Sequence, residues 1–268
     1  MTHDSYTQAH EALREQAPLV HCLTNSVVQE VTANVLLAVG AAPAMVSHPV
    51  EAAEFAEVAD AVLVNVGNPH LDQLKAMDNA LDTARRHHKV TVLDPVAVGG
   101  LSVRTEFARR VVEKRPTVIR ANPSEILHLH AAVTGSTHEG GRGVDATDSV
   151  DSALTAAREL AEYCGAVVAV SGATDVVVSP GRVTRIDGGD PLMAVTIGTG
   201  CALGAVVAAF VAAADSAHDA TVAAHVAFAT AAQRAAHRAD GPGTFRQFWL
   251  DELYRLPAAG VACRITED

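Results

Sequence analysis

Lysine is nearly absent from this sequence, in which only Lys75, Lys89 and Lys114 occur among 268 residues. Lysine and arginine together number 20 against 31 acidic residues, which gives a net charge of −11. This balance argues against a protein that binds DNA or RNA through a broad basic surface. No Gly-Lys pair occurs either, so the lysine of a P-loop is missing. Any phosphate chemistry would therefore depend on backbone amides, arginine or a bound metal.

The sequence also lacks the features of secreted and membrane proteins. Residues 1–16 contain no long apolar run, so we expect no signal peptide. Residues 191–214 carry no charge and are long enough to cross a membrane, but three glycines interrupt them. We expect a strand end, a tight loop and a buried helix there, and no membrane partner. The four cysteines form no Cys-x-x-Cys pair, which favours reduced thiols in the cytoplasm.

Short apolar runs that suit buried parallel strands alternate with helical segments along the chain. This order indicates an α/β fold with a mostly parallel central sheet and helices on both faces, in three α/β/α layers. We expect one domain over residues 1–268, with the glycine-rich stretch 136–149 as a surface or active-site loop. Predicted strands cover 61–67, 90–95, 117–122 and 166–172, with a hairpin of 175–179 and 182–187. Predicted helices cover 27–38, 51–59, 71–88, 105–115, 124–132, 148–165, 201–214, 219–238 and 244–254.

Polar residues and glycines follow the predicted strands. In parallel α/β sheets ligands bind beyond the carboxyl ends of the strands, so these residues are expected to meet at one edge. Together they offer carboxylate, arginine, hydroxyl and backbone amide groups. They are Asn65 to Asn68, Asp94 with Pro95, Arg120 to Asn122, Ser171 with Gly172, and Gly198 to Cys201.

The Gly198-Thr199-Gly200-Cys201 loop opens an alanine-rich apolar helix. Glycines let the backbone approach a ligand, and the helix N-terminus adds partial positive charge, so the loop could bind a phosphate group. Cys201 would lie in the first helical turn, where the thiolate is favoured. The alternative interpretation is a tight turn with a structural cysteine.

Three further polar groups have both a structural and a functional interpretation. Asp94 could cap a turn, or it could bind Mg²⁺ or an arginine. Glu125 could be only a capping carboxylate after Ser124, a possible N-cap, or it could hold a metal-bound water. Arg120 could form a surface ion pair, or it could bind phosphate oxygens in a bidentate way. The spacing of the histidines does not suit zinc, and no Gly-x-Ser-x-Gly motif marks a hydrolase nucleophile.

Six sequence blocks in order resemble the hydroxyethylthiazole kinase family of thiamine salvage, which has the ribokinase-like fold. The resemblance covers about residues 18–235, and Ala97-Val98 stand where the family has a Gly-Ala pair. The blocks are TNSVVQEVTANVLLAVGAAPAM (24–45), LVNVGN, LDPVAVG, IRANPSEI, VSGATDVV and GTGC (198–201).

The resemblance implies ATP-dependent phosphorylation of the primary alcohol of 4-methyl-5-(2-hydroxyethyl)thiazole, with Mg²⁺ as cofactor. It also implies a homotrimer with sites at the subunit interfaces. The implied catalytic residues are Cys201, Gly198, Thr199 and Gly200, and the implied ATP-binding residues are Arg120, Ser171 and Asn122. The implied thiazole-binding residues are Met45, Asn25, Val27, Gly67, Gly198 and Gly200, and the implied metal-binding residues are Asp94 and Glu125.

Cys201 distinguishes this sequence within the resemblance, because most ribokinase-like relatives carry an aspartate there as the base for the substrate hydroxyl. A thiol could serve as that base or only as a binding group. The alternatives that the resemblance leaves open are a hydroxymethylpyrimidine or pyridoxal kinase and the ATP-dependent NAD(P)H-hydrate dehydratase. A nucleotide- or thiazole-binding regulator without catalytic activity is a further alternative.

Overall fold

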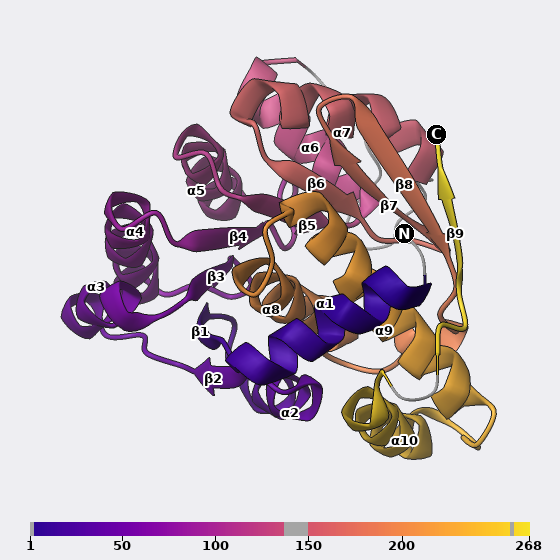
Figure 1. The fold of residues 1–268 in the computed structure, drawn as a ribbon. Coiled ribbons are helices and arrows are strands. Elements are labelled where there is room, and N and C mark those ends of the chain that lie inside the picture. Colours follow the sequence, from indigo (N-terminus) through magenta and orange to yellow (C-terminus); the bar gives the residue numbers. More distant parts are fainter. Residues whose placement is uncertain (1–2, 137–149, 258–259) are drawn as a thin grey trace.

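A nine-stranded sheet forms the centre of the protein (Figure 1). The computed structural model describes residues 3–136, 150–257 and 260–268. The strand order is β2-β1-β3-β4-β5-β6-β7-β8-β9; the first six strands in this order are parallel and the last three pair antiparallel. The strands are β1 (Leu19–Leu23), β2 (Ala42–Ala44), β3 (Ala61–Asn65), β4 (Val90–Asp94), β5 (Val118–Ala121), β6 (Val167–Val170), β7 (Thr174–Ser179), β8 (Arg182–Asp187) and β9 (Arg264–Glu267).

Helices cover both faces of the sheet, as Figure 1 shows. One face packs against α1 (His3–Gln16), α2 (Gln29–Val39), α8 (Thr199–Ala212), α9 (Ala217–Ala236) and α10 (Pro242–Arg255). The other packs against α3 (Pro49–Val58), α4 (Leu71–Arg86), α5 (Ser102–Glu113), α6 (Pro123–Thr134) and α7 (Val150–Cys164). This arrangement confirms the predicted α/β class with helices on both sides of a mostly parallel sheet.

The buried strands supply both hydrophobic cores, because successive side chains of a strand point to opposite faces. In β3, Leu63 lies in the core with α8 and α9, whereas Val62 and Val64 lie in the core on the other side. In β6, Ala169 and Val168 divide between the two cores in the same way. A strand that is buried on both faces has no polar alternation, which is why these runs are continuously apolar in the sequence.

One α-helix and three strands were not predicted from the sequence: α1, β1, β2 and β9. Helix α1 is largely polar, yet it buries Tyr6, His10 and Leu13, which lie at helical spacing on one side. Strand β1 buries a histidine, His21, and β2 has only three residues. Strand β9 has exposed ends and pairs with β8 at the edge of the sheet. Local sequence patterns predict such segments poorly, because strand pairing and side-chain packing decide their structure.

Two local expectations need correction. Residues 191–198 do not contain a strand end: β8 ends at Asp187, a 3₁₀ helix covers Pro191–Met193, and α8 begins at Thr199. Helix α6 begins at Pro123, and its N-cap is Asn122 instead of Ser124. The predicted loop 136–149 lies outside the described residues from position 137 onward. Among the helices that the structure describes, none is long and apolar enough to span a membrane.

Candidate active site

Two neighbouring parallel strands bring a buried amide and a buried carboxylate together. Asn65 ends β3 and Asp94 ends β4, and the two residues are paired in the strand register. Asn65 Nδ2 donates a hydrogen bond of 2.7 Å to Asp94 Oδ2. Asn65 Oδ1 accepts in turn from Asn25 Nδ2 at 3.1 Å, just beyond β1. All three side chains are buried, so this chain of polar groups holds the strand ends in fixed relative positions.

Cys201 extends the same network from the opposite side. Asn25 Nδ2 lies 3.6 Å from Cys201 Sγ, in the first turn of α8. Burial and the nearby carboxylate of Asp94 raise the pKa of Cys201, which hydrogen bonds from Asn65 and Asn25 partly lower again, so that it lies at about 11. The expectation that the helix start favours the thiolate is therefore wrong here. At neutral pH the group is a thiol that can donate or accept a weak hydrogen bond.

Arg120 occupies the strand next to Asp94 and approaches the Gly-Thr-Gly loop. Its Nε and Nη2 donate to Ser171 Oγ at 3.1 and 2.8 Å, and its Nη1 lies 3.9 Å from Asp94 Oδ2. A Cβ added to Gly200 would lie 3.4 Å from Arg120 Nη1, which shows how closely the loop backbone approaches the guanidinium. The structure thus brings four of the predicted strand ends to one edge of the sheet, as the sequence indicated.

A partly buried pair that the sequence did not reveal supports the loop after β6. Asp175 Oδ1 accepts a hydrogen bond of 2.8 Å from the backbone N–H of Gly172, which follows Ser171. Asp175 Oδ2 lies 2.7 Å from Nδ1 of His225, a fully buried residue of α9. No sequence motif surrounds His225 in its helical segment, so only the packing of α9 on β7 reveals this contact.

The Gly-Thr-Gly loop has a backbone that only glycine can adopt without strain at its first position. Gly198 is the N-cap of α8 and has a φ of 88°. A Cβ at this position would lie 2.3 Å from Val31 Cγ1 of α2, so the site also has no room for a side chain. The first N–H groups of a helix have no partner inside the helix. Those of α8 are therefore available to an anion beside Arg120.

Asp94 and Glu125 are the carboxylates closest in sequence to the ends of β4 and β5. Burial raises the pKa of Asp94, and Glu125 raises it further, whereas Arg120 and the hydrogen bond from Asn65 lower it. Asp94 Oδ1 is buried without a hydrogen-bond partner among the described residues. A buried, unpartnered carboxylate oxygen is unfavourable unless a cation or donor completes it. This oxygen is therefore suited to bind a metal ion or to accept a hydrogen bond from a ligand.

Glu125 performs the structural role that the sequence offered as one alternative. Its Oε2 accepts from the backbone N–H of Asn122, while Asn122 Oδ1 accepts from the N–H of Glu125, so the two form a capping box. Its Oε1 accepts from the N–H of Ala97 at 3.0 Å. Ala97 has a φ of 58°, a conformation that favours glycine. Each carboxylate oxygen keeps a second lone pair, so the capping role leaves room for a metal-bound water.

The described residues contain no group of three or more His, Cys, Asp or Glu side chains that could hold a metal by themselves. Magnesium commonly keeps several waters and takes only one or two carboxylates together with substrate phosphates. The donor set of Asp94 with Glu125 therefore fits Mg²⁺ delivered with a nucleotide and does not fit a closed protein-only site.

The predicted thiazole residues are placed less tightly. A Cβ at Gly67 would lie 2.9 Å from Asn25 Cβ, so these two residues are in close contact. Val27 lies in the following turn, and its N–H donates a hydrogen bond of 3.2 Å to Asn25 Oδ1. Its side chain is 60% exposed. Met45 follows β2, one strand further out, where it is half-buried against the core. Val27 and Met45 thus follow the carboxyl ends of the neighbouring parallel strands β1 and β2.

Comparisons with known proteins agree on one family. The model of the hydroxyethylthiazole kinase family matches residues 10–259. A hydroxyethylthiazole kinase of Corynebacterium glutamicum is 51% identical over 263 residues, which cover 97% of this chain and 96% of the relative. A hydroxyethylthiazole kinase of Kineococcus radiotolerans is 53% identical over 253 residues, which cover 94% of this chain and 90% of the relative.

Solved structures show the same fold. The structure of a hydroxyethylthiazole kinase protein from Pyrococcus horikoshii has a TM-score of 0.87 and 32% identity, and the match covers 97% of this chain and 98% of the other. The pyridoxal kinase of Staphylococcus aureus, solved with pyridoxal, has a TM-score of 0.67 at 15% identity, with 94% of this chain and 99% of the other covered. The second likeness bears on the fold alone.

Proposed function

The chain belongs to the hydroxyethylthiazole kinase family, and we propose that the residues at the carboxyl ends of its strands catalyse the reaction of that family. The reaction is the transfer of the γ-phosphoryl group of ATP to the primary hydroxyl of 4-methyl-5-(2-hydroxyethyl)thiazole. Phosphoryl transfer depends mainly on positioning and on charge stabilisation. The observation that carries the proposal is the close approach of the Gly-Thr-Gly backbone to Arg120.

The loop and Arg120 bind the transferring phosphoryl group in this proposal. The free N–H groups at the start of α8, around Thr199 and Gly200, donate to its oxygens. Arg120 contacts phosphate oxygens of ATP, with Ser171 holding the guanidinium in place. The side-chain amide of Asn122 faces the same nucleotide, since only its carbonyl oxygen is used by the helix cap. Backbone amides and one arginine thereby replace the lysine that the sequence lacks.

Asp94 and Glu125 would hold Mg²⁺, either directly or through water. When bound, the ion offsets negative charge on the phosphate oxygens of ATP. The unpartnered Oδ1 of Asp94 supports this assignment. Asn65 keeps the carboxylate of Asp94 oriented through its hydrogen bond to Oδ2.

Cys201 binds the hydroxyl of the thiazole alcohol in this proposal, because a thiol whose pKa is near 11 is a weak base at neutral pH. Asn25, which contacts both Cys201 and Gly67, forms the polar wall of the substrate site. Val27 and Met45 provide the apolar contacts for the thiazole ring, and the sulfur of a methionine adapts well to a small heteroaromatic ring. Gly198 and Gly200 contact the alcohol through their backbone, beside the phosphoryl group.

We further propose that the whole chain acts as one domain and assembles as a homotrimer with sites at subunit interfaces. The support is an exposed apolar group beside the site: Val27, Val195 and Ile197 are 60%, 65% and 62% exposed. All four cysteines are free, which supports a cytoplasmic location.

Coupled measurement of ADP release tests the proposed function. Purified protein with Mg²⁺ and ATP should turn over 4-methyl-5-(2-hydroxyethyl)thiazole with a kcat/KM far above that for hydroxymethylpyrimidine or pyridoxal. The same assay without an alcohol measures background ATP hydrolysis. Turnover of pyridoxal in preference to the thiazole, or no turnover at all, would contradict the proposal.

A further inference from the structure

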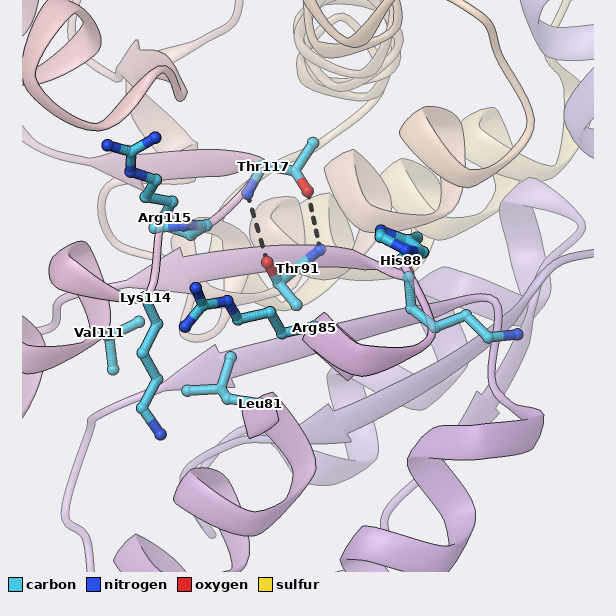
Figure 2. A pocket seen from close by; sticks show the side chains of 10 residues that line it. Leu81, Arg85, His88, Thr91, Val111, Lys114, Arg115 and Thr117 are labelled. Atoms are coloured by element: carbon cyan, nitrogen blue, oxygen red, sulfur yellow. Dashed lines mark hydrogen bonds between the residues drawn. The ribbon is translucent and has the colours of Figure 1, made fainter. Parts of the chain in front are cut away.

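A polar cavity lies at the starts of strands β4 and β5, away from the active-site residues at their carboxyl ends (Figure 2). It has a volume of about 230 Å³, and its base is formed by Thr91 at the start of β4 and Thr117 just before β5. The two threonines hold the strand starts together: the N–H of Thr91 donates to Thr117 Oγ1 at 3.1 Å, and the N–H of Thr117 donates to Thr91 Oγ1 at 3.3 Å. The active-site residues Asp94 and Arg120 lie further along the same two strands.

The rim of this cavity is basic, although the protein as a whole is acidic. None of its described lining residues is acidic, and two of the three lysines of the chain are among them. The basic residues come from the ends of α4 and α5 and from the segments that follow these helices. They are Arg85, His88, Lys89, Lys114 and Arg115.

Most of this positive charge has no protein partner. Lys114 pairs with Asp78 at 3.2 Å and with Asp82 at 2.7 Å. In the described part of the chain, Arg85, Lys89 and Arg115 make no ion pair. Like charges that gather around a cavity repel one another, and this repulsion is relieved when an anion binds between them.

Two of the basic residues hold an unusual backbone conformation at the cavity. His88 and Arg115 have φ values of 53° and 57°, which are uncommon for residues other than glycine. Each follows the end of a helix, α4 or α5, and each turns the chain into the next strand. Figure 2 shows the side chains of His88 and Arg115 on either side of Thr91 and Thr117, with Arg85 extending below them. The turns thus bring the imidazole of His88 and the guanidinium of Arg115 to opposite ends of the threonine pair.

We propose that this cavity binds a small anion that carries a phosphate or pyrophosphate group, at a site separate from the active site. Arg85 and Arg115 donate charge-assisted hydrogen bonds to its oxygens, since a guanidinium matches phosphate geometry. Lys89 adds a third positive charge. The hydroxyls of Thr91 and Thr117 line the base of the same site.

Calorimetric titration with inorganic phosphate tests the proposal. The titration is made in a full-length Arg120→Gln background, which removes the active-site arginine without adding a second phosphate ligand, and ionic strength is held constant with NaCl. We expect saturable phosphate binding that weakens about tenfold in the double variant Arg85→Gln/Arg115→Asn. Asparagine is chosen at position 115 because it tolerates a positive φ.

Arg86→Gln is the matched control, since Arg86 neighbours Arg85 on α4 but does not line the cavity. It should leave phosphate affinity unchanged, while Lys89→Gln should lower it even if the double variant proves less stable. If the parent protein shows no saturable binding, or if the double variant binds as tightly, the proposal is overturned. The basic residues then only offset the carbonyl ends of α4 and α5.

Discussion

Asn65 Nδ2 donates to Asp94 Oδ2 over 2.7 Å, across two paired and fully buried strand ends. This hydrogen bond lowers the pKa of Asp94, whereas burial raises it. Asn65 therefore helps to keep the carboxylate ionised in a place where burial alone would favour the protonated acid. The ability of Asp94 to bind a cation depends on this amide.

Replacing Asn65 by alanine should raise the Mg²⁺ concentration needed for half-maximal activity several-fold, because more of Asp94 is then protonated at neutral pH. Asp94→Ala should raise it more steeply. Coupled ADP release over a Mg²⁺ titration measures both effects. Asn79→Ala is the control, since Asn79 Nδ2 binds only the carbonyl oxygen of Pro49 on the surface. An unchanged titration for Asp94→Ala would remove Asp94 from the metal site.

Variants of Cys201 distinguish a base from a binding group. Cys201→Asp should retain or raise kcat, since a carboxylate accepts the proton of the hydroxyl more readily than a thiol does. Cys201→Ala should lower kcat, by about tenfold if the thiol only binds the hydroxyl and by a hundredfold or more if it is the base. Cys263→Ser controls for loss of a thiol away from the site. An alanine variant with an unchanged kcat would show that Cys201 has neither role.

Gly198→Ala should nearly abolish turnover. The added Cβ would lie 2.3 Å from Val31 Cγ1 and the position has a φ of 88°, so α8 must shift away from the phosphoryl site. A shift of about 1 Å at a reacting group can cost roughly a hundredfold in rate. Gly243→Ala is the matched control, because a Cβ there meets nothing within 4 Å. Steady-state kcat measures the effect, and equal kcat values for the two variants would contradict it.

Ala97→Gly should stabilise the protein. Ala97 has a φ of 58°, and a left-handed conformation costs an alanine about 1 kcal/mol or more. Urea unfolding should therefore show a free energy of unfolding that is higher by about 1 kcal/mol. Ala173→Gly, in an exposed loop without a positive φ, should instead be neutral or slightly destabilising. Destabilisation by Ala97→Gly would mean that the backbone strain is not relieved.

His10 should make the folded state sensitive to acid. It is fully buried between Tyr6 and Phe210, and burial lowers its pKa to about 4. The unfolded chain binds a proton near pH 6.5 and the folded chain does not, so stability falls as the pH drops from 6.5 towards 4. The slope is about 1.4 kcal/mol per pH unit.

Urea unfolding at several pH values between 7 and 5 measures this slope. The variant His10→Phe keeps a ring in the same contacts and should show a smaller loss of stability in acid. His70→Gln, at an exposed position, should keep the parent slope. An unchanged slope for His10→Phe would assign the acid sensitivity to other groups, such as the buried His218, whose pKa burial also lowers to about 4.

The sequence by itself determined the fold class and the edge of the sheet where the site lies. Continuous apolar runs predicted the buried parallel strands, and polar residues at their ends predicted Asp94, Arg120 and the Gly-Thr-Gly loop. These features are local, because burial on both faces and a glycine at a helix start leave a direct mark in the residue pattern.

Only the tertiary structure decided the contacts between those residues. The link from Asp94 through Asn65 and Asn25 to Cys201 depends on strand order, which no local pattern encodes. The pKa of Cys201 also depends on the tertiary structure. The helix start alone favours a thiolate, but burial and Asp94 favour the thiol. Burial and neighbouring charge are properties of the packed molecule, and they outweigh the local effect of one helix end.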